Sequence, residues 1–435
     1  MAVATMIDVP SSFTFVQGDL TMKLFRAIVI PILTLLFVLS LLSFQTSAAE
    51  DPALPVCYVR FSGTGLNVYI DPSMSGEPIA ILPDGTYVQI LLGPLDSLVR
   101  IRVYDTGLEG YVDIRYLGRL DAIVYDYDIY TYEEMEEDIL LLQAKYPDLL
   151  HVNLTGQSAD NRNLYELVLG NPNAPESILV HAGIHAREYD NPYLVMEQLE
   201  QCLEYYDCGN FHNKSYRELF DNVAVHIVPM VNPDGIALSQ FGENALRSPE
   251  LIRLVQTCYV YDVATKRTKN SYETYLSRWK ANARGVDLNR NFPFGFGANA
   301  KASHPSYMGY EGIAPFTEPE TLSLGAVTLL CQPSAIINYH SMGEIAYWNT
   351  VESRYTAINM EFSNYILSLV PYKRMGSGTA SGSYLDWIFN SDNPVCSITL
   401  ETGNVDCPFS LEQYPRIWLQ NALVIPAATE YTYTH

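Results

Sequence analysis

Two potential metal ligands lie three residues apart, directly after an apolar segment. The segment 178–182 is followed by GIHARE (residues 183–188), which holds the imidazole of His185 and the carboxylate of Glu188 on one turn. Zinc binds such nitrogen and oxygen ligands at about 2.0–2.2 Å, and a catalytic zinc takes three protein ligands and keeps one position open. Because this spacing occurs often by chance, zinc chemistry requires a third ligand from elsewhere in the chain.

His340 is the expected third ligand. It ends the apolar segment 335–339, and open α/β sheets place their sites beyond the carboxyl ends of strands. His181 lies inside the segment 178–182, and we expect it to be a core residue instead. A zinc site therefore requires a fold that brings His340 to the turn of His185 and Glu188.

The elements that must position these residues follow an alternating pattern of strands and helices from about residue 121. This pattern is typical of an α/β domain with a mixed, largely parallel sheet flanked by helices. Thr131 and Glu134 form a capping box ahead of an apolar helical stripe that closes near Pro147, and Pro192 is expected to open another helix. The remaining predictions are strands at 164–169, 178–182, 223–230, 335–339 and 395–400, and helices at 318–330 and 416–428.

Short β-rich segments separated by turns precede this domain, and they predict a small all-β barrel over residues 55–118. Their order, with DGT at 84–86 and GYV at 110–112, resembles the bacterial SH3-like domains attached to cell-wall enzymes. An unrelated small β domain is the alternative. The predicted strands of this region are 66–70, 87–92, 98–104 and 110–114.

An export signal is predicted at residues 22–49. Lys23 and Arg26 precede an apolar run at 27–42, and SAA at 47–49 is the small-residue pattern of a cleavage site. We therefore expect a secreted, extracellular protein. Association of this protein with the cell wall stays open. The alternative is an anchor, although a run of this length is short of the ~20 residues that span a bilayer.

Charge and cysteine content exclude two classes of protein. The 435 residues include 26 Lys and Arg against 49 Asp and Glu, a formal net charge of −23, whereas binding to nucleic acid needs clustered basic residues. Seven scattered cysteines form no CxxC pair and are too few for a disulfide scaffold. We expect mostly buried thiols, although export leaves open a bridge between Cys202 and Cys208 or between Cys396 and Cys407.

The ordered motifs of residues 121–432 resemble the zinc metallocarboxypeptidase family of the carboxypeptidase A type. The motifs are GIHARE at 183–188, NPDG at 232–235, GVDLNRN at 285–291, the histidine at 340 and TLETG at 399–403. The resemblance implies a carboxypeptidase-like fold and one Zn²⁺ per chain, held by His185, Glu188 and His340. It also implies that Glu401 accepts a proton from water acidified by the metal and delivers it to the leaving amine.

Further residues match positions that orient ligands or bind substrate in this family. Asp287 matches the carboxylate that orients the first zinc histidine and fixes its tautomer. Asn289 and Arg290 match the pair that binds the terminal carboxylate of the substrate, a task suited to a planar guanidinium. Arg187 is expected to add a second positive contact further along the substrate.

The chain departs from the family pattern at two positions. Lys280 stands where the family usually places the arginine that stabilises the oxyanion, and Arg284 is the alternative donor. Gly378 stands at the expected place of the mobile tyrosine, for which Tyr384 is a substitute candidate. Leu385 lies near the specificity position and would line an apolar pocket.

The segments 279–293 and 339–344 resemble most the bacterial branch that includes γ-D-glutamyl-diamino-acid peptidases. This resemblance implies a peptidoglycan stem peptide as substrate and a monomer whose N-terminal domain contacts the wall and tethers the enzyme there. Two alternatives stay open. One is a general secreted carboxypeptidase that trims ordinary peptides, and the other is a non-catalytic protein that binds the cell wall or peptides.

Overall fold

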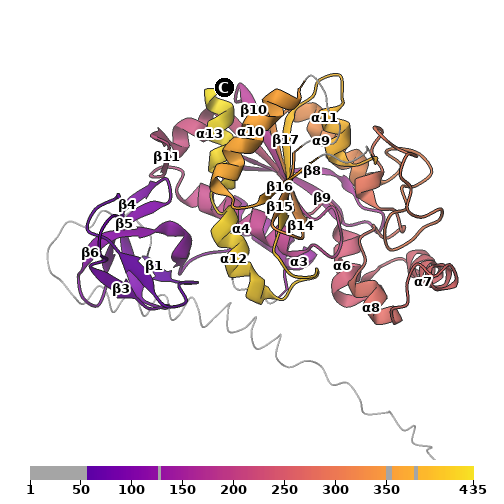
Figure 1. Cartoon of the computed structure of the whole chain (residues 1–435), viewed down its shortest axis with the longest axis horizontal. Coiled ribbons are helices and arrows are strands. Elements are labelled where there is room, and N and C mark those ends of the chain that lie inside the picture. Colours follow the sequence, from indigo (N-terminus) through magenta and orange to yellow (C-terminus); the bar gives the residue numbers. More distant parts are fainter. Residues whose placement is uncertain (1–55, 126–128, 349–354, 377–380) are drawn as a thin grey trace, which may run out of the picture. The chain divides into compact units, whose positions relative to one another are not determined.

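The computed structural model of the chain describes residues 56–125, 129–348, 355–376 and 381–435 (Figure 1). The predicted export signal at 22–49 and the glycine at 378 lie outside these residues. Within the described part, no helix is both long and apolar enough to cross a membrane.

An eight-stranded mixed sheet forms the larger domain. Its strand order is β16-β15-β17-β14-β10-β13-β9-β8, and the four central strands β17, β14, β10 and β13 run parallel to one another. Strand β15 pairs antiparallel with β17, and β9 pairs antiparallel with both β13 and β8. The strands are β8 (Leu150–Gln157), β9 (Asn163–Leu169), β10 (Glu176–His181), β13 (Val223–Val228), β14 (Ala335–Ser341), β15 (Ile345–Tyr347), β16 (Lys373–Met375) and β17 (Cys396–Thr402).

Helices cover both faces of this sheet, because alternate residues of a strand point to opposite faces. In β10, Ile178 and Val180 pack in the apolar core that includes α4 and α13, whereas Leu179 packs in the core that includes α9 and α11 (Figure 1). The helices are α3 (Tyr132–Lys145), α4 (Asp190–Glu204), α5 (Tyr216–Asn222), α6 (Pro233–Phe241), α7 (Pro249–Ala264), α8 (Tyr272–Ser277), α9 (Pro319–Cys331), α10 (Thr356–Leu369), α11 (Tyr384–Phe389), α12 (Tyr414–Asn421) and α13 (Val424–Thr434).

The N-terminal region folds as a small β domain. Its antiparallel strands bury every second side chain, as in β5, where Val99, Ile101 and Val103 are buried and the residues between them are exposed. The strands are β1 (Val56–Val59), β2 (Leu66–Val68), β3 (Ala80–Leu82), β4 (Tyr87–Leu95), β5 (Leu98–Val103), β6 (Glu109–Asp113) and β7 (Leu117–Arg119).

Several contacts join the β domain to the larger domain. Strand β4 pairs with the short strand β11 (Asn210–Phe211), and Arg60 forms a buried ion pair with Glu197 of α4. The indole Nε1 of Trp418 donates a hydrogen bond to the carbonyl of Arg115 at 3.0 Å. One apolar core therefore continues from the β domain into α4 and α12.

The structure confirms the predicted fold class and several predicted element boundaries. Thr131 caps α3 in the predicted capping box with Glu134. Helix α4 begins at Asp190, two residues before the predicted start, and the predicted helix at 416–428 is two helices, α12 and α13. All seven cysteines are free thiols, so neither bridge that export would allow is formed.

Candidate metal centre

The turn after β10 carries the first two candidate ligands. Gly183 adopts a φ of +67°, and a Cβ added there would lie 3.0 Å from side-chain atoms of Ile236 and Pro192, so the turn requires glycine. The N–H of Glu188 donates to the carbonyl of His185 at 3.2 Å. This bond closes the turn and directs both side chains to one side.

The neighbouring strands supply the other two residues. His340 in β14 pairs in register with Glu401 in β17, and residues opposite each other in adjacent strands point to the same face. Because Tyr339 and Leu400 pack in the core on the side of α4 and α13, His340 and Glu401 point to the opposite face. The sheet therefore places them side by side beyond the turn of His185.

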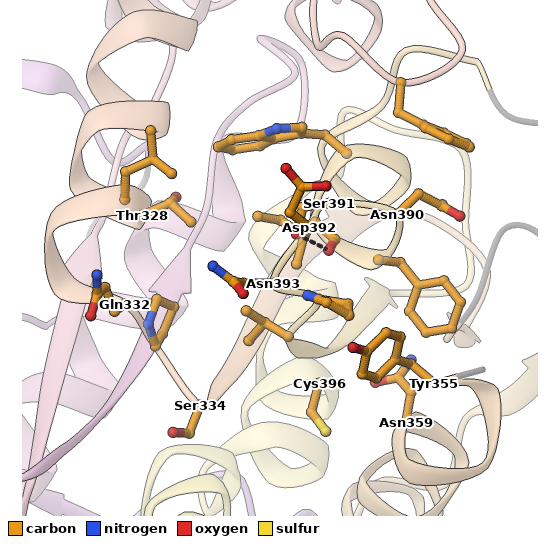
Figure 2. A pocket seen from close by; sticks show the side chains of 18 of the residues that line it. Thr328, Gln332, Ser334, Tyr355, Asn359, Asn390, Ser391, Asp392, Asn393 and Cys396 are labelled. Atoms are coloured by element: carbon orange, nitrogen blue, oxygen red, sulfur yellow. Dashed lines mark hydrogen bonds between the residues drawn. The ribbon is translucent and has the colours of Figure 1, made fainter. Parts of the chain in front are cut away.

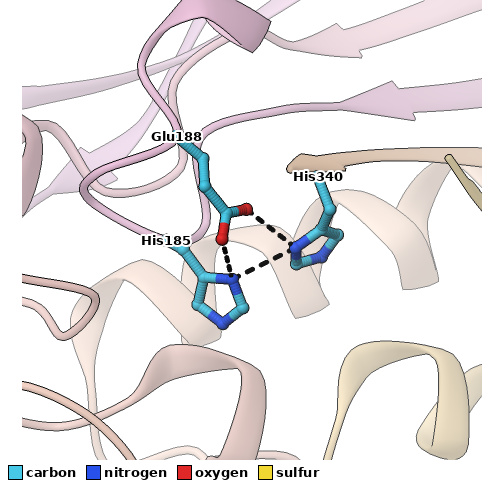
Figure 3. Close-up of side chains that lie close together, drawn as sticks. All are labelled: His185, Glu188 and His340. Atoms are coloured by element: carbon cyan, nitrogen blue, oxygen red, sulfur yellow. Dashed lines mark hydrogen bonds and ion pairs between the residues drawn. The ribbon is translucent and has the colours of Figure 1, made fainter. Parts of the chain in front are cut away.

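Three side chains converge as the sequence predicts for a zinc site (Figure 3). The Nδ1 atom of His185 lies 2.9 Å from Glu188 Oε1, and the Nδ1 atom of His340 lies 3.1 Å from Glu188 Oε2 and 3.1 Å from His185 Nδ1. In a tetrahedral zinc site with ligands at ~2.0–2.1 Å, neighbouring ligand atoms are about 3.3 Å apart. Two buried imidazole nitrogens facing one carboxylate thus fit a zinc ion.

Asp287 lies behind the first histidine, where the sequence predicts it. Its Oδ1 atom is 3.3 Å from His185 Nε2, and its Oδ2 atom accepts a hydrogen bond from the N–H of Gly309 at 2.9 Å. Burial acts to raise the pKa of Asp287, but the contact with His185 and the nearby cations outweigh burial and lower it well below its usual range. An ionised Asp287 favours a proton on Nε2 and leaves Nδ1 free for metal.

Lys280 points at the candidate ligands, whereas Arg284 does not. The Nζ atom of Lys280 lies 3.4 Å from Glu188 Oε1, while Arg284 is half-exposed and pairs with Glu318. Burial acts to raise the pKa of Glu188, but the charges of His185 and Lys280 outweigh it and lower the pKa. The site therefore keeps Glu188 as a carboxylate beside a fixed positive charge.

The pKa of Glu401 is raised, in contrast to the lowered pKa values of Glu188 and Asp287. Burial and the charge of Glu188 raise its pKa, whereas His340, Lys280 and Arg187 lower it, and the result is a pKa of about 7. A carboxyl group with a pKa near neutrality exchanges protons readily at physiological pH.

The predicted carboxylate-binding residues lie on the far side of His340. Asn289 Nδ2 is 3.4 Å from His340 Nε2, and Asn289 Oδ1 accepts a hydrogen bond from the N–H of Tyr384 at 2.9 Å. Arg290 and Arg187 are half-buried, and the Arg187 charge acts on Glu401. The charges of Arg187 and Lys280 thus act on Glu401, and the charge of Arg290 acts on Asp287 behind the first histidine.

Tyr384 and Leu385, two residues predicted to contact the substrate, are buried at the start of α11. The Tyr384 hydroxyl is buried and shares a hydrogen bond with Thr328 Oγ1 at 2.7 Å, so it points into the core instead of replacing a mobile tyrosine. Leu385 is buried on α11. His181 is fully buried, as predicted, and its ring packs edge-on against Tyr384 at 4.6 Å.

Two further groups near the centre carried no recognisable signal in the sequence. The backbone N–H of Ser341 donates to Glu188 Oε2 at 3.1 Å, a contact that only the fold creates. Asp190 is a buried carboxylate two residues after Glu188, and a lone aspartate in the first turn of a helix has no distinctive spacing.

A large cavity of the described residues lies away from this centre. It measures about 1010 Å³ and is lined by the end of α9, the start of α10 and the segment after α11, including Trp387, Asn393 and Ser334 (Figure 2). A smaller cavity of about 390 Å³ is lined by Tyr189 and Asp190, which follow Glu188 in the chain, and by none of the candidate ligands.

The known family with this site is zinc carboxypeptidase, whose sequence model matches residues 135–422. This chain belongs to the zinc carboxypeptidase family. It is a metallopeptidase whose cofactor is zinc, and His185, Glu188 and His340 form the one cluster of potential metal ligands among the described residues.

Relatives from bacteria and animals cover much of the chain. It is 28% identical over 303 residues to Gamma-D-glutamyl-L-diamino acid endopeptidase 1 of Lysinibacillus sphaericus, covering 68% of this chain and 71% of that protein. It is 26% identical over 319 residues to the uncharacterized protein YqgT of Bacillus subtilis, covering 72% of this chain and 80% of that protein. Human carboxypeptidase A6 is 24% identical over 291 residues, covering 62% and 59%.

A solved structure has the same fold as this zinc carboxypeptidase. Bovine thrombin-activatable fibrinolysis inhibitor, in complex with a tick carboxypeptidase inhibitor, aligns with a TM-score of 0.54 at 19% identity. The alignment covers 70% of this chain and 98% of that one. The likeness confirms the carboxypeptidase-like sheet and its helices.

Proposed function

We propose that this metallopeptidase hydrolyses peptidoglycan stem peptides at the bond between γ-D-glutamate and the diamino acid. The observation that carries the proposal is the complete charged constellation around His185, Glu188 and His340. The name of the Lysinibacillus relative supports the substrate class. The bond in question lies next to a residue that bears a carboxylate, which agrees with the cations around the site.

The proposed metal ligands are His185, Glu188 and His340, with Asp287 orienting the first. Zinc bound there would acidify water and polarise the peptide carbonyl. Glu401 accepts the proton of the attacking water and delivers it to the leaving amine, a transfer for which a pKa near 7 is suited.

Lys280 stabilises the negative charge that develops on the carbonyl oxygen in this proposal. Its Nζ atom lies beside Glu188 and therefore close to any carbonyl that approaches the metal. A cation positioned before the reaction stabilises developing charge without reorganisation.

Asn289 and Arg290 bind the carboxylate of the residue that leaves. Both follow Asp287 in the same segment, and Asn289 is fixed beside His340 by the N–H of Tyr384. Arg187, whose charge acts on Glu401, adds a second positive contact further along the substrate. The bound peptide is therefore oriented with its leaving residue at Asn289.

A general carboxypeptidase is the second candidate function. The buried apolar Leu385 on α11 favours it, because an apolar specificity position suits apolar C-terminal residues. A protein that only binds the wall or a peptide is disfavoured, since a constellation with perturbed carboxylates is typical of catalysis.

Secretion and wall contact belong to the same proposal. The export signal at 22–49 would deliver the enzyme to the wall. Binding of the SH3-like β domain to the wall would then raise the local concentration of the enzyme there. The β strands of residues 56–119 support this part of the proposal.

Incubation with defined peptides tests the function directly. Purified protein is given a stem tripeptide, a longer stem peptide and ordinary peptides with free or amidated C-termini, and products are identified by mass. Cleavage between D-glutamate and the diamino acid in both stems supports the proposal. Loss of single C-terminal residues from ordinary peptides, with no cleavage of stems, contradicts it in favour of a general carboxypeptidase. Glu401→Gln is the control for contaminating peptidase.

A further inference from the structure

A strip of the sheet continues the candidate centre away from the metal ligands. Strand β17, which carries Glu401, lies between β14 with His340 and the short strands β15 and β16. Ile345 of β15 pairs in register with Glu401, and Lys373 of β16 pairs in register with Ile345. One row across four neighbouring strands therefore runs from His340 to Lys373.

The whole row faces one side of the sheet. Paired residues of adjacent strands point to the same face, and the residues that alternate with this row point to the other. Ala346 is buried in the apolar core on the side of α4 and α13, and the Arg374 guanidinium donates a hydrogen bond to α10 on that same side. Ile345 and Lys373 thus share the face of Glu401.

Tyr347 lies on the same face in the adjoining row. It is half-buried opposite Thr399, two residues before Glu401 in β17. Burial and the charge of Glu401 raise the pKa of Tyr347, so its hydroxyl keeps its proton. Neither this hydroxyl nor the exposed ammonium of Lys373 has a hydrogen-bond or ion-pair partner among the described residues. The strip therefore offers two free donors.

The proposed reaction places the leaving residue beside this strip. The amine of that residue must come within hydrogen-bond reach of Glu401, which delivers the proton, and its carboxylate is bound by Asn289 and Arg290. The metal ligands occupy the side of Glu401 toward β14 and β10. The side chain of the leaving residue therefore extends to the other side, toward β15 and β16.

The row matches the parts of a long side chain with a charged end. Neighbouring strands lie about 4.8 Å apart, so the backbone of Lys373 is about 10 Å from that of Glu401. Ile345, half-buried between them, offers apolar surface for methylene groups. An ammonium and a hydroxyl at the far end suit a carboxylate, whereas a lone ammonium there would be repelled by Lys373.

We propose that Lys373 and Tyr347 bind a carboxylate at the far end of the leaving residue's side chain. The inference rests on the proposed function for the placement of the leaving residue. It narrows that residue to a diamino acid that bears a carboxylate at its far end, such as meso-diaminopimelate. Lysine, whose side chain ends in an ammonium alone, is a poor leaving residue in this proposal.

Two forms of one peptide test the subsite without any mutation. A stem tripeptide that ends in meso-diaminopimelate is compared with the same peptide in which only the far carboxyl group is amidated. We expect kcat/KM of the zinc-loaded wild-type protein to be about ten- to a hundredfold higher for the free carboxylate, the range of a charged hydrogen bond. Equal values, or a preference for the amide, would overturn the proposal.

Lys373→Met identifies the cation responsible. The ratio of the two kcat/KM values should fall to about one, whereas Lys373→Arg, which keeps the charge, should retain the preference. Lys269→Met is a matched control, because Lys269 is exposed after α7 and the charge change is the same, and its ratio should equal that of the wild type. A loss that is equal for both peptides in Lys373→Met would assign Lys373 a structural role in β16 and refute the subsite.

Tyr347→Phe tests the second donor. Removal of the hydroxyl should lower the same ratio by about two- to tenfold, the range of a single neutral hydrogen bond. An unchanged ratio would refute the place of Tyr347 in the subsite.

Binding to the zinc-loaded Glu401→Gln protein separates this inference from the proposed function. Calorimetry with the same two peptides reports recognition whether or not either is cleaved. Tighter binding of the free carboxylate, lost in Glu401→Gln/Lys373→Met, would support the subsite even if the wild type cleaved another bond. Equal binding of both peptides would refute the subsite while leaving the peptidase function intact.

Discussion

The two ends of the central strands differ in what they carry. The carboxyl ends of β14 and β17 carry His340 and Glu401, with buried charge held within a few ångströms. Their amino ends, near Ser334 and Cys396, border the cavity of about 1010 Å³, where Asp392 is the one charged side chain among the described lining residues. The large cavity therefore holds a single charged side chain, whereas the charged groups gather at the opposite ends of the same strands. Buried, mutually dependent charges locate this catalytic site better than volume does.

Removal of a ligand at the carboxyl end should have the largest effect. His185→Ala should lose zinc and reduce hydrolysis to the background rate, because two remaining ligands bind the ion far more weakly. Elemental analysis of the purified variant measures zinc per chain. A variant with one zinc per chain would remove His185 from the ligand set.

Glu401→Gln should lower kcat by about 10²–10⁴-fold, the usual contribution of a positioned acid–base group. Zinc content should stay at the wild-type value, because Glu401 is not a proposed ligand. Steady-state kinetics with the cleaved peptide measure the effect. Undiminished turnover would exclude Glu401 from proton transfer.

Lys280→Met should lower kcat by about 10²–10³-fold, as the loss of an oxyanion-stabilising group does. Arg284→Met provides the comparison, since Arg284 pairs with Glu318 away from the centre. We expect its kcat to stay within about twofold of the wild type. The reverse ranking of the two variants would reassign the stabilising cation to Arg284.

The rate should fall on the acid side by about tenfold for each pH unit below the pKa of Glu401. A base works when it is deprotonated, so a raised pKa shifts the loss of activity toward neutral pH. Burial raises this pKa to about 7, and bound zinc opposes the shift, so the midpoint should lie between about 4.5 and 7. A pH profile of kcat/KM measures it, and the same midpoint in the residual activity of Glu401→Gln would contradict the assignment.

A substitution at the amino ends should have the smallest effect. Asp392→Asn removes the charge of the large cavity, and an exposed substitution of this kind changes stability by less than about 0.5 kcal/mol. Zinc content and kcat should match the wild type. A tenfold fall in kcat would show that this cavity takes part in the reaction and would undo the contrast between the two ends.

Local pattern was enough to predict much of the site. The turn with His185 and Glu188 follows a buried strand, and His340 ends another, so both could be placed from sequence. The choice between Lys280 and Arg284 could not, because both lie in one loop and only the packed structure directs Lys280 toward Glu188. Tyr384 was misleading for the same reason, since its hydroxyl turns to Thr328 in the core.

The fold was predictable where the strands are buried and less so at the edges. Strand β14 is buried along its whole length and β10 at all but its first residue, and each contains a run of three apolar residues, 178–180 and 335–337. The two outermost strands on one side of the sheet, β16 and its neighbour β15, have three residues each and are partly exposed, so their hydrophobic pattern is too short to stand out.

The buried pair of Arg60 and Glu197 makes the two domains poor candidates for separation by genetic truncation. A shortened chain that begins after residue 119 would leave Glu197 without its cation on α4, the same helix whose first turn holds Asp190. Anyone grafting the catalytic part onto a different carrier must therefore bring residues 56–119 along or redesign the outer surface of α4.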